Sequence, residues 1–319
     1  MKKYDVAAMG ELLIDFTQNG YSEQENPIFE ANPGGAPCNV LAMLQKLGRK
    51  TAFIGKVGQD GFGLQLEKAL KETGISTDGL CFDKEVHTTL AVVQKKEDGD
   101  RDFSFYRKPG ADMMLRAEEV NEDLIRNAAI FHYGSLSLTD EPVRTATVSA
   151  IEEAEKAGVL LSFDPNLRKP LWESEELAKK QIRYGLGHCH VLKISDDELV
   201  WLTGEQDYEK AIQQLRSEFP IPLILLSMGK NGSRAYCGEE TAEAPAFLSE
   251  NTIETTGAGD TFMGCMLHQI LEKGYQNLST RDMEEMLIFA NAAASIITTR
   301  RGALRVMPEE KEILKRINF

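Results

Sequence analysis

Short apolar runs alternate along this chain with longer stretches in which apolar residues recur at helical spacing. The runs that predict buried strands are residues 6–9, 51–57, 129–133, 159–163, 190–194 and 223–227. The stretches that predict helices are residues 39–47 and 64–73, each followed by a glycine, and residues 140–156, 173–186 and 207–217. Strands and helices in this order are typical of a parallel sheet covered on both faces. We therefore predict an α/β fold with a mainly parallel central sheet.

Two regions, residues 12–32 and 80–108, do not follow this alternation of strands and helices. Their alternating apolar and polar residues, as in Asp102-Phe103-Ser104-Phe105-Tyr106, are typical of half-buried strands, and Glu97-Asp98-Gly99-Asp100 suits a hairpin turn. We interpret both regions as a small β-sheet that stands off the main core and forms a candidate lid. A peripheral hairpin or a surface for a second subunit explains the same pattern, and the lid and subunit roles are compatible.

The composition fits one folded unit. With 319 residues, 42% of them hydrophobic, the chain can bury a large core, so we expect a single domain over residues 1–319. The net charge of -14 argues against a nucleic-acid partner, because phosphate binding needs clustered Lys and Arg. No apolar run approaches the length of a membrane span, so no membrane partner is expected. The five cysteines are dispersed without a CxxC pair, which is typical of reduced thiols in a cytoplasmic protein.

The most informative chemistry lies in Thr255-Thr256-Gly257-Ala258-Gly259-Asp260-Thr261-Phe262. Small residues let a ligand approach the backbone, and the helical pattern that follows places unpaired N–H groups and the positive end of a helix dipole beside it. Such a turn can hold the charge of a phosphoryl group, and Asp260 then stands where an attacking hydroxyl loses its proton. An ordinary helix start with a favoured Asp explains the same residues.

A second glycine motif, Gly34-Gly35-Ala36-Pro37-Cys38-Asn39, favours the phosphoryl-binding interpretation over an ordinary helix start. Two glycines precede a predicted helix, and Pro37 suits its first turn. Bare backbone at the glycines lets a flat ligand lie close, and the Asn39 amide both donates and accepts, as a sugar hydroxyl requires. Alone, this motif also fits a helix entry turn.

Together the two motifs resemble those of the ribokinase-like (PfkB-type) carbohydrate kinase family, over nearly the whole chain. The resemblance is carried by Gly10-Glu11 with Asp15, residues 34–39 and 55–63, Asp164-Pro165-Asn166-Leu167-Arg168, Lys193 to Glu198, Gly229 to Gly232, the run around Asp260, and Arg301-Gly302-Ala303. It implies a ribokinase-like three-layer fold and ATP-dependent phosphorylation of a sugar hydroxyl.

For the sugar side, the resemblance implies a role for each matching residue. The residues expected to perform the transfer are Asp260, as catalytic base, and Gly257, Ala258 and Gly259, whose backbone is the expected anion hole. The residues expected to bind the sugar are Asp15, Gly34, Gly35, Asn39 and Phe105. Arg107 and Arg168 carry forks of donors suited to phosphate or carboxylate, and we expect both to meet the substrate. A surface ion pair is the alternative for each arginine.

For the cofactor side, the resemblance implies ATP and Mg²⁺. The residues expected to bind the nucleotide are Lys193, Ser227, Gly229, Gly232 and Asn291. Glu198 is expected to organise Mg²⁺ through water, because this ion keeps several waters and takes few carboxylates directly. The segment from Ser195 to Glu198 also fits a helix cap. Ala294 and Ser295 leave room for an adenine or else permit close helix packing.

One position departs from the family pattern. The family usually has Asp where this chain has Glu254, and in many members that acid helps to hold a monovalent cation beside the anion hole. Glu254 is longer by one methylene, and Val306 stands where some members have a polar residue in the cation loop. Backbone carbonyls can still bind an ion, so both outcomes for a monovalent cation stay open.

Within the family, residues 34–40 and 105–107 are most like fructokinases, because Ala36 stands where typical ribokinases have lysine. We therefore expect phosphorylation of D-fructose at the 6-hydroxyl by a homodimer formed through the lid. The alternative is 2-keto-3-deoxygluconate kinase, which shares the Asp-x-Asn-x-Arg pattern and a pair like Leu171-Trp172. A sugar or nucleotide sensor without turnover is a different class of hypothesis. An oxidoreductase is disfavoured, because no G-x-G-x-x-G follows the first strand.

Overall fold

The computed structural model describes residues 2–95 and 101–318, and the predicted turn at 97–100 lies outside them. Its central sheet has nine described strands in the order β13-β12-β11-β10-β9-β8-β1-β4-β5. Their bounds are β1 Tyr4–Met9, β4 Thr51–Gly58, β5 Ser76–Asp83, β8 Ala128–Gly134, β9 Leu160–Asp164, β10 Val191–Ser195, β11 Leu223–Ser227, β12 Ser233–Cys237 and β13 Glu240–Ala244. All pairings from β11 to β5 are parallel, and β12 and β13 add an antiparallel edge. The predicted mainly parallel sheet is confirmed.

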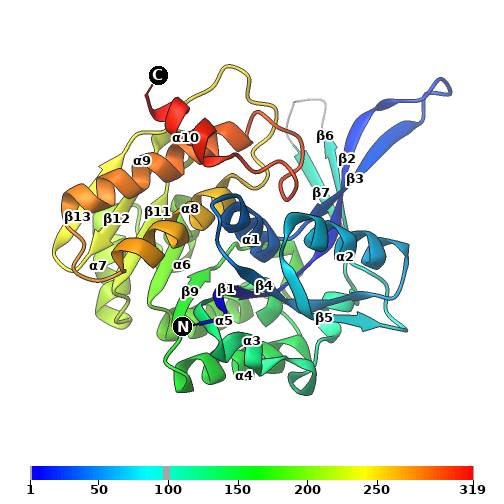
Figure 1. The fold of residues 1–319 in the computed structure, drawn as a ribbon, viewed down its shortest axis with the longest axis horizontal. Helices are drawn as coiled ribbons and strands as arrows, with labels where there is room; N and C mark the ends of the chain where they lie inside the picture. The colour runs from blue at the N-terminus through cyan, green and yellow to red at the C-terminus, as the bar shows by residue number, and fades with distance from the viewer. Residues whose placement is uncertain (1, 96–100, 319) are drawn as a thin grey trace.

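Helices cover both faces of this sheet. Their bounds are α1 Ala36–Lys46, α2 Gly61–Thr73, α3 Glu122–Arg126, α4 Val143–Lys156, α5 Glu175–His188, α6 Asp196–Thr203, α7 Tyr208–Glu218, α8 Ala258–Lys273, α9 Thr280–Ile297 and α10 Glu310–Ile317. Val6 and Ala8 of β1 enter the core with α1, α2, α8, α9 and α10, whereas Ala7 and Met9 enter the core with α3 to α7. Successive strand side chains point to opposite faces, so one strand joins two cores in a three-layer fold (Figure 1).

A separate four-stranded sheet has the order β3-β2-β6-β7. Its strands are β2 Leu13–Tyr21, β3 Pro27–Gly34, β6 Leu90–Lys95 and β7 Arg101–Tyr106. Figure 1 shows β2 and β3 projecting as a long hairpin beyond the body of the molecule, beside β6 and β7. The predicted second segment began too early, because residues 80–83 end β5 in the main sheet. The register places Asp15, Ala91 and Phe105 opposite one another, so these side chains share one face of the small sheet.

The parallel strands bring several polar residues to one edge of the main sheet. Glu11 lies just beyond β1, Asp164 ends β9, and Ser227 ends β11. Lys193 is the middle residue of β10. The carboxyl ends of parallel strands meet at the same edge, which is where open α/β sheets bind ligands.

Candidate active site

Helix α8 begins at a turn built on Gly257, whose φ of 74° lies in the left-handed region. A Cβ at this position would lie 2.6 Å from the Cβ of Ala303, so the turn packs too closely for a side chain. Ala258, Gly259 and Asp260 form the first turn of the helix, where backbone N–H groups have no partner within the helix. The predicted anion-hole residues therefore lie at a helix N-terminus, with Asp260 on its first turn.

Asp260 meets Asn39 although 221 residues separate them along the chain. Asn39 Nδ2, on the first turn of α1, donates to Asp260 Oδ2 at 2.8 Å. Burial raises the pKa of the Asp260 carboxyl, while this hydrogen bond and the charges of Lys193 and Arg168 oppose the rise. The other polar atom of the amide, Asn39 Oδ1, is buried and accepts no hydrogen bond from the described residues. The pair thus presents one oriented carboxylate and one unused acceptor.

The two glycines before α1 allow the close approach of β2. A Cβ on Gly34 would lie 2.1 Å from Asp15 Oδ2, and one on Gly35 would lie 2.4 Å from the carbonyl oxygen of Glu11. Gly35 also has a φ of 124°. The motif therefore gives the Asp15 carboxylate room in front of α1.

Asp15 and Asp260 line one cavity of about 230 Å³, which we call the acid cavity. Its other predicted site residues are Gly35, Asn39, Phe105, Arg168, Lys193, Gly257 and Gly259. Residues from β2, α1, β7, the loop after β9, β10 and α8 thus surround a single space. Opposite ends of the chain converge there, as the sequence interpretation requires.

Burial raises the pKa of Asp15 to about 7; Arg168 opposes this rise, whereas Asp260 and Glu254 add to it. The pKa of Asp15 is thus higher in the folded protein than in the unfolded chain. The stability that protonated Asp15 contributes to the fold is fully present below the unfolded pKa and is lost as pH rises through about 7.

We therefore expect Asp15→Asn to raise the melting temperature relative to the unmodified protein, more at about pH 8 than at about pH 5. Thermal melts at both pH values check this. Asp123→Asn is the matched control, because the Asp123 side chain is 80% exposed. A difference between Asp15→Asn and the unmodified protein that does not grow with pH would contradict the raised pKa.

The structure does not bring Arg107 into the acid cavity with the other predicted sugar-site residues, and places it instead beside a neighbouring cavity. Its side chain is buried, and Nε lies 2.7 Å from Asp112 Oδ2 in a buried ion pair. Its Nη1 donates to Thr139 Oγ1 at 3.0 Å, and Nη2 donates to the carbonyl oxygen of Leu136 at 2.9 Å. Leu136 itself lines the acid cavity, whereas Arg107 does not. The guanidinium therefore supports the cavity wall, and we do not assign it a substrate contact.

Lys193 lies beneath the helix start, in the acid cavity rather than among the nucleotide residues expected from the sequence. Its Nζ is 3.0 Å from Asp164 Oδ2, and a Cβ on Gly259 would lie 3.1 Å from the same Nζ. Burial raises the pKa of Asp164 to about 6, although Lys193 opposes this. The ammonium group is therefore a fixed positive charge directly behind the anion-hole backbone.

Glu198 is held by the backbone of two elements. It accepts hydrogen bonds from Leu167 N at 2.7 Å and from Ser195 N at 2.9 Å, and it completes the capping box of α6. Burial tends to raise the pKa of Glu198, but Lys193 and these amides lower it overall. The carboxylate is therefore ionised and fixed, and its remaining lone pairs suit metal-bound water better than direct coordination. Among the described residues, no cluster of three or more His, Cys, Asp or Glu is placed to hold a metal alone.

A second cavity, of about 510 Å³, adjoins the acid cavity and is called here the Asn291 cavity. Four of the five predicted nucleotide residues line it, namely Ser227, Gly229, Gly232 and Asn291, together with Ala294 and Ser295. Thr255 and Gly259 line both cavities, so the two spaces meet at the start of α8.

The side-chain amide of Asn291 forms its hydrogen bonds within the protein, so this residue shapes the cavity wall. Its Nδ2 donates to the carbonyl oxygens of Ala244 and Pro245, both at 3.1 Å, and its Oδ1 accepts from Ser233 Oγ at 3.0 Å. The amide thereby fixes the chain after β13 against α9.

Glu11 belongs to the site but had no role assigned from sequence. Its Oε1 accepts a hydrogen bond from Ala36 N at 2.9 Å, and the side chain lines the acid cavity. Burial raises the pKa of Glu11 to about 7. Its position directly after β1 in the Gly10-Glu11 pair was the available signal, but only the fold shows that it caps α1 from another element.

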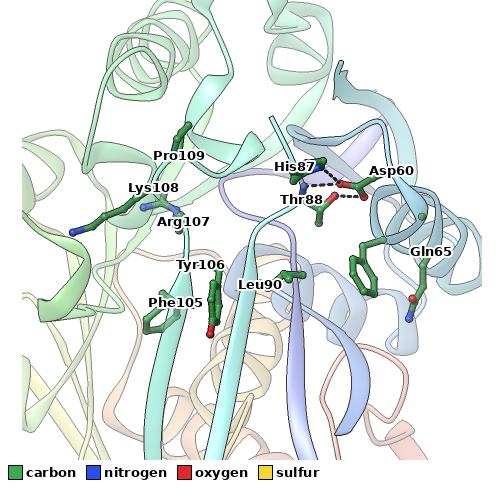
Figure 2. A pocket seen from close by; sticks show the side chains of 12 residues that line it. Asp60, Gln65, His87, Thr88, Leu90, Phe105, Tyr106, Arg107, Lys108 and Pro109 are labelled. Atoms are coloured by element: carbon green, nitrogen blue, oxygen red, sulfur yellow. Dashed lines mark hydrogen bonds and ion pairs between the residues drawn. The ribbon is translucent and has the colours of Figure 1, made fainter. Parts of the chain in front are cut away.

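A third and larger cavity, of about 770 Å³, lies on the other face of the small sheet. Figure 2 shows Leu90 and Tyr106, from neighbouring strands, beside it, with Asp60 bound to Thr88 and His87 at one end. It contains neither Asp15 nor Asp260. We therefore place the chemistry in the smaller acid cavity, where the ionisable groups converge.

A profile of the pfkB family carbohydrate kinases matches residues 3–310, and the chain belongs to this family. It is a sugar kinase, an enzyme that transfers a phosphoryl group to a sugar hydroxyl. A probable fructokinase-4 of Arabidopsis thaliana is 43% identical over 97% of this chain and 95% of that protein.

Solved structures agree with this relationship. A fructokinase with bound ATP from Xylella fastidiosa has a TM-score of 0.89 and 31% identity, over 99% of this chain and 98% of that one. A double mutant of a fructokinase from Vibrio cholerae, solved with fructose, ADP and a potassium ion, has a TM-score of 0.87 and 27% identity over 99% of both chains. The predicted family and its likeness to fructokinases are confirmed. Within the described residues, no helix has the length and apolar character needed to cross a membrane.

Proposed function

We propose that this protein is a fructokinase that transfers the γ-phosphoryl group of ATP to the 6-hydroxyl of D-fructose. The observation that carries the proposal is that the acid cavity and the Asn291 cavity meet at Gly259, beside Asp260. An acceptor in the first cavity and a nucleotide in the second would face each other across the start of α8. The fructokinase relatives, which match along nearly the whole chain, support the choice of fructose.

In the proposed reaction, Asp260 takes the proton of the 6-hydroxyl as its oxygen attacks the γ-phosphorus. The bond between the γ-phosphorus and the bridging oxygen breaks, and ADP leaves with that electron pair. The N–H groups at the start of α8 and the Lys193 ammonium offset the charge on the transferred group. Asn39 orients the Asp260 carboxylate through its 2.8 Å hydrogen bond.

Sugar binding in this proposal uses Asp15 and the unused Oδ1 of Asn39 as acceptors for hydroxyl groups. Arg168 supplies donors from the loop after β9, and Phe105 lines the cavity from β7. The small sheet is proposed to act as a lid of one domain, because the face that carries Asp15 and Phe105 covers the cavity.

Mg²⁺ is the metal we propose, because it neutralises phosphate charge and retains water ligands. The residues would fit it through Glu198, whose carboxylate is held by Leu167 N and Ser195 N. We further propose a cytoplasmic location, since all five cysteines are free thiols.

A keto-acid substrate was the alternative within the family. Arg107 and Arg168 together would be the groups to hold its carboxylate, because both carry forks of donors. Because Arg107 is committed to Asp112, Thr139 and Leu136, only one arginine remains for that purpose. This observation favours fructose.

An ATP-coupled assay with D-fructose and with 2-keto-3-deoxygluconate tests the proposal. We expect a larger kcat/KM for fructose, with ³¹P and ¹³C NMR placing the phosphate on the 6-oxygen. Preferred turnover of the keto-acid would reverse the choice of sugar. Binding of sugar and nucleotide without turnover would instead indicate a sensor.

We also propose a homodimer formed through the outer face of the small sheet. Three large side chains of the small sheet are exposed, Tyr21 and Ile28 at the far end of the β2–β3 hairpin by 68% and 46% and Tyr106 at the end of β7 by 65%, and a partner would cover them. We expect Tyr106→Lys to shift the protein from dimer to monomer in sedimentation velocity. Leu314→Lys, on α10, is the control and should leave the dimer intact. A monomeric unmodified protein at working concentration would refute this interface.

A further inference from the structure

The turn that precedes Asp260 rests on the loop that follows α9. Ile253 N and Glu254 N both donate to the carbonyl oxygen of Thr298, at 2.8 and 3.2 Å. Gly302 N donates to Glu254 Oε1 at 2.7 Å. The position of the predicted anion hole therefore depends on how firmly residues 298–307 are held.

Loop and turn are also in steric contact. The Cα position of Gly257 faces Ala303 so closely that an added Cβ would lie 2.6 Å from the Ala303 Cβ. Any shift of Ala303 is consequently transmitted to the first residue of the anion hole. Glu254 is 6% exposed, so its contact with Gly302 is shielded from solvent.

A monovalent cation is the group that the family resemblance implies at this place, and the Vibrio cholerae relative was solved with a potassium ion. The residues of this chain do not fit such an ion. Glu254 Oε1, from the position of the family acid, accepts the Gly302 amide. The carbonyl oxygen of Val306, in the expected cation loop, accepts from Arg300 Nη1 at 2.7 Å. The Oε1 oxygen of Glu254 and the carbonyl oxygen of Val306 thus each already accept an N–H donor of this chain.

Arg300 is itself a fixed positive charge in this loop. While Nη1 binds Val306, its Nη2 lies 2.5 Å from Glu312 Oε1 on α10. The guanidinium thereby joins the loop to the C-terminal helix. The guanidinium, held in this position, supplies a positive charge to the loop without an ion from solution.

We propose that Glu254 is a positioning residue whose bridge to Gly302, with the Arg300–Val306 contact, holds the anion-hole turn in place without a monovalent cation. The extra methylene of Glu relative to the Asp of the family gives the carboxylate the reach to accept the Gly302 amide directly. A charge-assisted hydrogen bond then connects the two segments. The consequence is a kinase whose nucleotide affinity and stability do not depend on K⁺. The inference depends on the proposed function only for the role of the turn in phosphoryl transfer.

The test compares KCl with choline chloride at equal ionic strength, using thermal melts and calorimetric titration with Mg·ADP. For the unmodified protein we expect the same melting temperature in both salts and a Kd for ADP that changes by less than about twofold, because an ion that does not bind the native state cannot stabilise it. A K⁺-specific rise in melting temperature or ADP affinity would overturn the proposal. Neither readout requires sugar turnover, so failure of the proposed fructokinase activity is distinguishable.

Glu254→Asp tests the bridge itself. Shortening the side chain removes its reach to Gly302, so we expect a lower melting temperature and about tenfold weaker ADP binding in choline chloride. Glu239→Asp, at the exposed turn between β12 and β13, is the matched control and should match the unmodified protein. Melting temperature and ADP affinity of Glu254→Asp equal to those of the unmodified protein would overturn the bridging role.

Discussion

Replacing Asp260 by Asn is expected to lower kcat by about 10³-fold, within the range that general base catalysis supplies, while the KM for the sugar changes little. The amide keeps the shape of the side chain beside Asn39, but it cannot take a proton from the attacking hydroxyl. Burial already raises the pKa of Asp260, and the Asn39 hydrogen bond restrains that rise. The carboxylate is therefore both ionisable and more basic than an exposed Asp.

Steady-state kinetics with saturating ATP measure this effect, and a thermal melt verifies that the variant is folded. Asp123→Asn serves as the matched control, because this acid lies on the surface helix α3 away from the acid cavity. Unchanged turnover in Asp260→Asn would remove this residue from the base role, whatever the sugar.

Gly34→Ala is expected to raise the KM for the sugar by about 10²-fold, since hydrogen bonds to a charged group account for that order of affinity. The added Cβ would lie 2.1 Å from Asp15 Oδ2, so the carboxylate must leave its position. Asp15→Ala should have a similar effect, because both changes remove the same acceptor. The double variant should then resemble Asp15→Ala alone, as expected for coupled neighbours.

The control for added volume is Gly187→Ala on α5, where a Cβ meets no atom within 4 Å. This variant should retain the KM of the unmodified protein. A Gly34→Ala variant with normal sugar affinity would show that Asp15 does not contact the acceptor. Strictly additive effects in the double variant would lead to the same conclusion.

Much of the main sheet was predictable because its strands are buried on both faces. Residues 51–57 and 223–227 are mainly apolar, and the observed strands Thr51–Gly58 and Leu223–Ser227 match them closely. The β12–β13 hairpin was not predicted, because it is an edge with mixed composition. Gly238, with a φ of 57° in its turn, was the available signal.

The small sheet shows where local pattern fails. The sequence of residues 80–83 is compatible with a half-buried strand in either sheet. Only their parallel pairing with β4 assigns them to β5 of the main sheet. Arg107 is a similar case. Its place at the end of β7 suggested a ligand contact, but Asp112 and Thr139 come from elements whose proximity the sequence does not show.

By itself, the sequence determined the α/β class, the two glycine turns and the identity of the acids, because these depend on periodicity and on the special backbone needs of glycine. Only the tertiary structure decided which polar groups share a cavity. Asn39 and Asp260 are bonded, Arg107 is withdrawn into a buried ion pair, and Glu254 reaches Gly302. Such choices depend on distances between segments far apart in the chain, where one methylene or one strand register decides whether two groups meet.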